Sequence, residues 1–193
     1  MKKVAITGNI GSGKSAACKV FETLGIPVFY ADQQAKALYG DVRVQQSVRE
    51  AFGDDIFDMH NKLIKSKLAA LIFNDKKALQ TINNIIHPRM MQQYANWLEQ
   101  HANAVYTLHE AAVIFENGLD VYFDKIINVS APVELRILRI MKRDQLTRQA
   151  VENRMAMQWP DEKKNEKADF VIVSNNKRFL IPQVLKIHNS LIK

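Results

Sequence analysis

Eight residues near the amino terminus have the types and spacing of a loop that binds phosphate groups. Gly8 to Ser15 reads Gly-Asn-Ile-Gly-Ser-Gly-Lys-Ser, which fits G-x-x-x-x-G-K-[ST] at every fixed position. Glycines let successive backbone N–H groups turn toward phosphate oxygens, and the following helix adds its positive end. Lys14 is expected to reach the terminal phosphates, and the Ser15 hydroxyl to bind Mg²⁺. An ordinary glycine-rich turn is the alternative.

The segments on both sides of the loop favour the phosphate-binding interpretation. Lys2–Thr7 is short and apolar, which predicts a strand, and a helical stretch runs from Lys14 to Leu24. Val28–Tyr30 reads as a second strand. The order strand, loop, helix, strand predicts a parallel sheet covered by helices. The residues expected to contact the nucleotide phosphates are Gly8, Gly11, Ser12, Gly13, Lys14, Ser15 and Ala16.

Acidic residues follow two of the predicted strands. Asp32 lies near the carboxyl edge of the sheet, where α/β proteins build their sites. A carboxylate there can orient an acceptor hydroxyl and take its proton, but aspartate is equally favoured as a helix N-cap. Glu110 ends the strand predicted from Val105, where a second carboxylate often assists Mg²⁺. Glu116 is a candidate for positioning substrate, and a surface carboxylate is the alternative for both glutamates.

Basic residues are concentrated in the last third of the chain, which carries the whole net charge of +7. Residues 1–124 hold 13 Lys and Arg against 13 Asp and Glu, whereas residues 125–193 hold 14 against 7. Helices are predicted over Pro132–Arg143 and Thr147–Gln158. Guanidinium groups suit phosphates because they donate two parallel hydrogen bonds, so we expect a lid that closes over the nucleotide. A nucleic-acid surface and a solvated basic face are the alternatives. The arginines are Arg136, Arg139, Arg143, Arg148 and Arg154, with Arg139 and Arg143 the best candidates for phosphate contact.

The middle of the chain reads differently from the strand-rich ends. From Asp32 to about Gln100, apolar residues recur at helical spacing, which predicts a helical subdomain that interrupts the sheet. Pro88 is expected to start a new helix, with His87 and Arg89 as candidates for contacting substrate. A capping histidine is the alternative. Further strands are predicted at Val105–Leu108, Lys125–Val129 and Phe170–Val173, and a closing helix at about residues 179–191.

Composition excludes several other classes. The chain has 193 residues, 47% of them hydrophobic, which suits one globular domain with an insertion. Cys18 is the only cysteine, so there is no disulfide framework, and the five histidines lack metal-ligand spacing. No apolar run is long enough to span a bilayer. The amino terminus runs directly into the first strand, so we expect no removable signal peptide and a cytoplasmic protein.

The loop and later segments, taken in order, resemble the dephospho-coenzyme A kinase family from end to end. The segments that carry the resemblance after the loop are Tyr30–Asp32, Ile86–Arg89, His109–Leu119, Arg139–Asp144, Arg154–Gln158 and Ala168–Ile172. The resemblance implies transfer of the γ-phosphate of ATP to the ribose 3′-hydroxyl of dephospho-coenzyme A, with Mg²⁺. It implies Asp32 as the general base. Together with Lys14 of the loop and Arg139 of the expected lid, this gives the expected catalytic set.

The resemblance also implies an architecture and a set of partners. We expect an α/β P-loop sheet core at about residues 1–31, 103–133 and 168–193, a helical substrate subdomain at 32–102 and a lid at 134–167. ATP and dephospho-coenzyme A are the expected partners, without nucleic acid or membrane. Whether the chain forms a homo-oligomer is left open by the sequence. Departures from the family pattern fall at Ala16, Ala112 and Ser174. Another small-molecule P-loop kinase, or a nucleic-acid-dependent NTPase, is the alternative.

Overall fold

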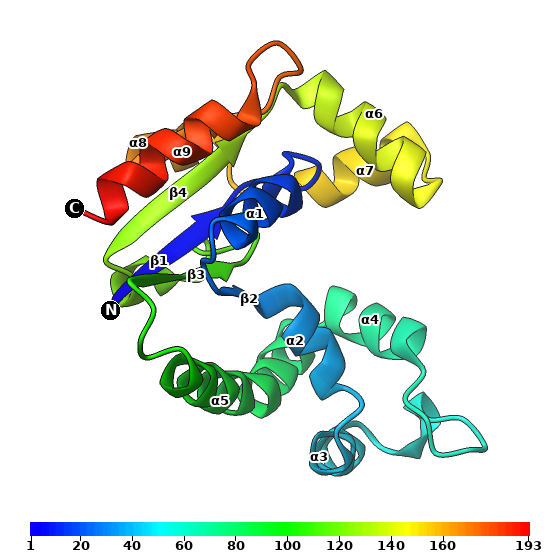
Figure 1. The fold of residues 1–193 in the computed structure, drawn as a ribbon. Helices are drawn as coiled ribbons and strands as arrows, with labels where there is room; N and C mark the ends of the chain where they lie inside the picture. The colour runs from blue at the N-terminus through cyan, green and yellow to red at the C-terminus, as the bar shows by residue number, and fades with distance from the viewer. The chain divides into compact units, whose positions relative to one another are not determined.

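The computed structural model describes residues 1–193, leaving out the side chains of Phe73 and Asn74. The chain forms two compact units (Figure 1). The first consists of Met1–Tyr30 together with His101–Lys193, and the second of Ala31–Gln100. Each unit has its own hydrophobic core.

The first unit is built on a five-stranded parallel sheet in the order β2-β3-β1-β4-β5. In the centre, β1 pairs with β3 on one side and with β4 on the other. Val4, Ala5 and Ile6 are fully buried, because a parallel sheet covered by helices buries both faces of its central strand. The sheet confirms the predicted α/β class. The strands are β1 (Lys2–Thr7), β2 (Val28–Tyr30), β3 (Tyr106–Glu110), β4 (Lys125–Ser130) and β5 (Phe170–Val173).

Helices cover this sheet and extend from it. The helices α1 (Lys14–Thr23) and α9 (Leu180–Leu191) pack together and bury Phe21 and Val184 in the main core. The pair α6 (Val133–Asp144) and α7 (Arg148–Met155) forms a small separate cluster. A short helix that the sequence did not predict, α8 (Asp161–Lys167), packs against β4. The short turn η2 (Leu119–Tyr122) precedes β4.

The second unit is helical. Its core is formed by buried residues such as Leu38, Val44 and Val48, packed against Ile82 and Ile86 of the longest helix. Among the described residues, no helix combines the length and apolar character needed to cross a membrane. The elements are α2 (Ala31–Leu38), α3 (Val42–Phe52), η1 (Asp54–Ile56), α4 (Lys65–Asn74) and α5 (Lys76–Gln100).

The prediction that Pro88 starts a new helix is wrong, because Pro88 lies inside the 25-residue helix α5. Proline removes one helical hydrogen bond and crowds the carbonyl one turn earlier, which usually ends or kinks a helix. Here Ile82 and Ile86 before the proline, and Met90 after it, pack against one core. Burial of that continuous apolar stripe outweighs the lost hydrogen bond. His87 and Arg89 therefore lie in mid-helix and not at a helix start.

Candidate active site

The loop between β1 and α1 follows a path that requires glycine, as Gly8 and Gly13 show. Gly8 has φ of 148°, and a Cβ there would lie 2.4 Å from the carbonyl oxygen of Val129. Gly13 has φ of 102°, and a Cβ there would lie 2.8 Å from Ser174 Oγ. The loop is thus pressed against the ends of β4 and β5. The loop runs directly into the amino terminus of α1 at Lys14, and a helix amino terminus after such a glycine-rich loop binds anions.

A lysine and a glutamate meet beside this loop. Lys14 Nζ donates a hydrogen bond of 2.8 Å to the Gly8 carbonyl and lies 3.7 Å from Glu110 Oε1. Both side chains are about nine-tenths buried, at 11% and 8% exposed. The sheet register explains the meeting, because Ile6 of β1 pairs with Glu110 at the end of β3. A cation and a carboxylate are therefore fixed where two central strands end.

The residues around the loop fit a magnesium ion. Ser15 is exposed in the first turn of α1, which leaves its hydroxyl accessible, and Glu110 supplies a carboxylate nearby in the loop region. Mg²⁺ keeps several waters and takes one or two protein side chains together with substrate phosphates. Within the described part of the chain, no group of three or more His, Cys, Asp or Glu could hold a metal. With one or two protein side chains as ligands, a Mg²⁺ here would take its remaining ligands from the nucleotide phosphates and from water.

Arg139 ties the loop to the segment that follows β5. Its guanidinium donates to the carbonyl oxygens of Gly11 and Ser12, at 3.2 and 3.3 Å. It also donates to Ser174 Oγ at 3.2 Å and to Asn176 Oδ1 at 2.8 Å. The arginine predicted to act in the lid is therefore brought to the loop, but against its carbonyl groups. To contact a phosphate it would have to exchange some of these partners.

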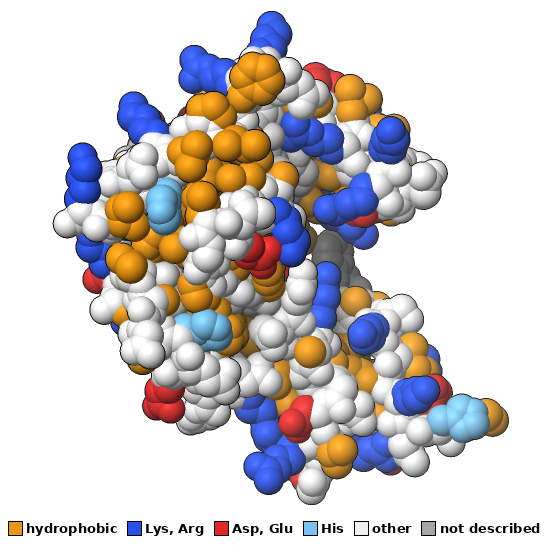
Figure 2. Space-filling view, viewed as in Figure 1, with side chains coloured by type: hydrophobic (Ala, Val, Ile, Leu, Met, Phe, Trp, Pro, Cys, Tyr) orange, Lys and Arg blue, Asp and Glu red, His pale blue; other side chains and the backbone are white. Residues whose placement is uncertain are grey.

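The other lid arginines have different surroundings. Arg143 is 64% exposed and pairs with Asp144 at 2.7 Å. Arg148 pairs with Glu134 at 2.6 Å and with Glu152 at 2.8 Å, so acidic neighbours neutralise part of the local charge. Lys and Arg side chains are nevertheless prominent over the α6–α7 part of the surface (Figure 2). Arg143 is exposed and able to meet an anion that approaches this surface.

Residues after α7 contact the loop directly, and sequence reasoning missed this. The Ile10 N–H donates to Gln158 Oε1 at 2.8 Å, and Asn9 Nδ2 donates to the Trp159 carbonyl at 3.0 Å. The Trp159 N–H in turn donates to Glu116 Oε1 at 3.0 Å. Gln158 ends the Arg154–Gln158 segment that carries the family resemblance, but Trp159 was not among the expected site residues. The Gln158–Trp159 segment thus connects the phosphate loop to Glu116.

A fully buried lysine completes this connection. Lys164 is 0% exposed; its Nζ lies 2.7 Å from Glu116 Oε1 and donates to the Ala112 carbonyl at 2.8 Å. Burial lowers the pKa of Lys164, and its hydrogen bond to Glu116 opposes that shift. Glu116 is therefore paired inside the protein, while its Oε2 is buried without a partner among the described residues. The sequence Asp-Glu-Lys-Lys-Asn-Glu-Lys around Lys164 is strongly charged and gave no indication that one of its lysines is buried.

Three predicted site residues belong to the second unit. Asp32 is exposed and is the second residue of α2, so it does not occupy the N-cap position that was its alternative. His87 is exposed on α5, and Arg89 Nη1 lies 4.0 Å from Asp41 Oδ1 within the same unit. Their roles in the site stay predictions.

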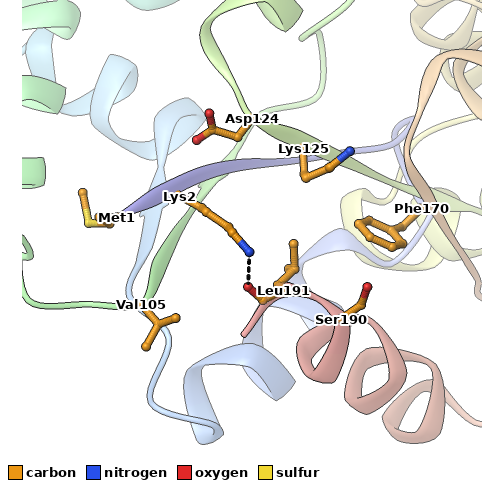
Figure 3. A pocket seen from close by; sticks show the side chains of 8 residues that line it. All are labelled: Met1, Lys2, Val105, Asp124, Lys125, Phe170, Ser190 and Leu191. Carbon is orange, nitrogen blue, oxygen red and sulfur yellow. Dashed lines mark hydrogen bonds between the residues drawn. The ribbon is translucent and has the colours of Figure 1, made fainter. Parts of the chain in front are cut away.

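A separate hollow of about 540 Å³ lies at the other end of the sheet (Figure 3). It is lined by residues at the starts of strands, among them Lys2 and Lys125, whereas the phosphate loop follows a strand's carboxyl end. Its charged groups have partners within the protein. Lys2 Nζ donates to the Leu191 carbonyl at 2.8 Å, and Lys125 pairs with Asp169 at 2.6 Å. This hollow has none of the phosphate-loop residues, so the loop is the better candidate site.

Comparison with known proteins gives one consistent result. A family model described as dephospho-CoA kinase matches residues 2–179. A dephospho-CoA kinase from Bacteroides fragilis is 34% identical over 187 residues, covering 96% of this chain and 90% of that protein. One from Chlorobaculum tepidum is 34% identical over 197 residues, covering 98% of this chain and 94% of that protein.

Solved structures agree with the sequence comparisons. The crystal structure of TT1252 from Thermus thermophilus has a TM-score of 0.92 at 26% identity, covering 100% of this chain and 98% of that one. A dephospho-CoA kinase from Campylobacter jejuni has a TM-score of 0.70 at 25% identity, covering 98% and 96%. A shikimate kinase from Acinetobacter baumannii, with a TM-score of 0.54 at 14% identity and coverage of 100% and 93%, shares the fold.

Proposed function

The chain belongs to the dephospho-CoA kinase family, and on this premise we propose how its residues perform the family's reaction. It uses ATP to phosphorylate dephospho-CoA, a step of coenzyme A biosynthesis. The γ-phosphate passes to the ribose 3′-hydroxyl, and the products are coenzyme A and ADP. The observation that carries this function is the phosphate loop, with Lys14 and Glu110 fixed beside it, in a chain that matches the family over residues 2–179.

On the donor side, the loop N–H groups and Lys14 hold the ATP phosphates. Lys14 gives up its hydrogen bond to the Gly8 carbonyl and turns to the β- and γ-phosphates. Ser15 and Glu110 are the residues that would hold Mg²⁺, and the ion would neutralise charge on the transferring group. Gly8, Gly11, Ser12, Gly13 and Ala16 contribute backbone contacts to the phosphates.

On the acceptor side, Asp32 is the general base. It accepts the proton of the ribose 3′-hydroxyl as the hydroxyl oxygen bonds to the γ-phosphorus and the bond from that phosphorus to the β–γ bridging oxygen breaks. Its exposed place in the first turn of α2 supports this role, because an approaching hydroxyl can reach the carboxylate. His87 and Arg89 bind the substrate. Glu116 positions the substrate indirectly, because its carboxylate accepts the hydrogen bond from the Trp159 N–H and so fixes the Gln158–Trp159 segment.

The lid, at about residues 134–167, closes over ATP and excludes water. Arg143 is the arginine best placed to contact a phosphate because it is exposed. Arg139 releases its bonds to the loop carbonyls and donates instead to the phosphate group that is transferred. The core at about residues 1–31, 103–133 and 168–193 carries ATP, and the helical subdomain at 32–102 carries the acceptor.

An acceptor assay tests this function. The protein is incubated with ATP, Mg²⁺ and dephospho-CoA, and in parallel reactions with nucleoside monophosphates or shikimate as acceptors. We expect ADP and coenzyme A in equal amounts, and little turnover of the other acceptors. Rapid turnover of another acceptor without coenzyme A formation would overturn the proposal. We also propose that the protein acts in the cytoplasm without nucleic acid, so RNA and DNA should leave its ATP turnover unchanged.

A further inference from the structure

A small apolar groove lies within the second unit, between α2 and the segment that leads into α4. Its volume is about 220 Å³. Its apolar lining is supplied by Tyr39 just after α2, Leu63 before α4, and Leu68 and Ile72 of α4. Ligand sites for whole drug-sized molecules are roughly 300–1,000 Å³. This groove therefore suits one extended arm of a larger substrate.

Two lysines stand at the rim of the groove. Lys36 and Lys65 both line it and are both exposed. Neither forms an ion pair with any carboxylate whose position the structure describes. An apolar groove with two unneutralised cations at its edge is complementary to a molecule with an anionic group joined to an apolar arm.

The helix α2 aligns this groove with the proposed base. Asp32 and Lys36 are spaced i and i+4, so they lie on one face of α2, and Tyr39 directly follows the last residue of the helix. Lys36 is one turn beyond Asp32, a rise of about 6 Å. In dephospho-CoA the 5′-diphosphate is separated from the 3′-hydroxyl by the ribose, and the pantetheine arm continues from the diphosphate. The order hydroxyl, diphosphate and arm in the substrate matches the order carboxylate, lysine and groove along the helix.

We propose that this groove binds the pantetheine arm of dephospho-CoA, with Lys36 and Lys65 binding its diphosphate. The proposal rests on the function proposed above and assigns the part of the substrate that does not react. The dimethyl group of the arm packs on Leu63, Leu68 and Ile72. The Tyr39 hydroxyl donates to an amide carbonyl of the arm; burial raises the pKa of Tyr39, so it stays protonated at neutral pH.

The test uses 4′-phosphopantetheine, which carries the arm and one phosphate but no adenosine. It should inhibit the wild-type protein competitively against dephospho-CoA and not against ATP. The variant Ala69→Tyr fills the groove from an exposed position of its lining. It should raise both the KM for dephospho-CoA and the inhibition constant about tenfold, with the KM for ATP unchanged. The control Ala37→Tyr alters an exposed alanine of α2 outside the groove and should change neither.

A second pair of variants tests whether a lysine at the rim of the groove binds the diphosphate. Lys36→Ala should raise the KM for dephospho-CoA about tenfold, whereas Lys62→Ala, an exposed lysine outside the groove, should not. Thermal unfolding verifies that every variant is folded. Wild-type kinetics in both Ala69→Tyr and Lys36→Ala would overturn the groove proposal while the function stands. A wild-type protein that forms no coenzyme A would instead overturn the function itself.

Discussion

Replacing Lys164 by methionine should destabilise the protein strongly, because it leaves the Glu116 carboxylate unpaired in the interior. Lys164 is fully buried, and the Glu116 side chain is only 11% exposed. Removing one partner of a buried ion pair costs about 3–5 kcal/mol. Glu116 keeps its hydrogen bond from the Trp159 N–H, so the lower end of that range applies. For a chain of this size, about 3 kcal/mol corresponds to a fall in Tm of about 6–12 °C.

The double variant separates the pair from simple packing loss. Glu116→Gln removes the charge and keeps an oxygen for the Trp159 N–H, so Lys164→Met combined with Glu116→Gln should be more stable than Lys164→Met alone. The control is Lys163→Met, which removes an exposed lysine whose Nζ lies 3.5 Å from the centre of the Trp159 ring. It should cost less than about 1 kcal/mol. Urea unfolding followed by circular dichroism measures the wild type, the single variants Lys164→Met, Glu116→Gln and Lys163→Met, and the double variant.

Two results would refute this reasoning. A loss below about 1 kcal/mol in Lys164→Met would mean that Glu116 is not held as a buried ion. A double variant as unstable as the sum of the two single variants would mean that the two side chains do not interact.

Three further predictions concern the loop, the base and a buried histidine. Asp32→Asn should lower kcat by more than tenfold with little change in ATP affinity, measured by steady-state kinetics and by titration with ATP; lost ATP binding would contradict a base. Gln158→Ala removes the acceptor of the Ile10 N–H and should weaken ATP binding about fivefold; equal or tighter binding would show that the contact does not support the loop. Burial lowers the pKa of His109 from 6.5 to about 4, so the unfolded chain binds a proton that the folded chain excludes. The stabilising contribution of the neutral His109 is therefore complete above pH 6.5 and falls toward pH 4 by up to about 3 kcal/mol. Urea unfolding at pH 7 and 4.5 should show a smaller loss of unfolding free energy in His109→Phe than in the wild type. An identical loss in both proteins would contradict the pKa shift.

The parts of the fold that could be predicted are those whose chemistry is local. The phosphate loop needs glycine at Gly8 and Gly13 because of backbone geometry, and the sequence shows those residues directly. The strands of the sheet are short apolar runs, so their order along the chain predicted the parallel core.

The unpredicted features depend on contacts between distant segments. Lys164 is buried only because α8 packs against β4, and a lysine in a charged helix gives no sign of this. Gln158 reaches Ile10 across 148 positions of sequence. Pro88 led to a wrong prediction, because the packing of Ile82 and Ile86 before it and of Met90 after it outweighed the helix-breaking effect of proline. In each case tertiary packing decided the outcome, and one sequence shows packing only indirectly.

The measurement that most directly tests the central claim is the position of the transferred phosphate. The protein is given ATP, Mg²⁺ and dephospho-CoA, the product is characterised by ³¹P NMR, and Lys14→Ala serves as the matched inactive control. The account predicts one ADP for each product molecule, a new phosphate on the ribose 3′-oxygen, and a rate lower by orders of magnitude in Lys14→Ala. ATP hydrolysis without a phosphorylated acceptor, or a phosphate at another position of dephospho-CoA, would contradict it.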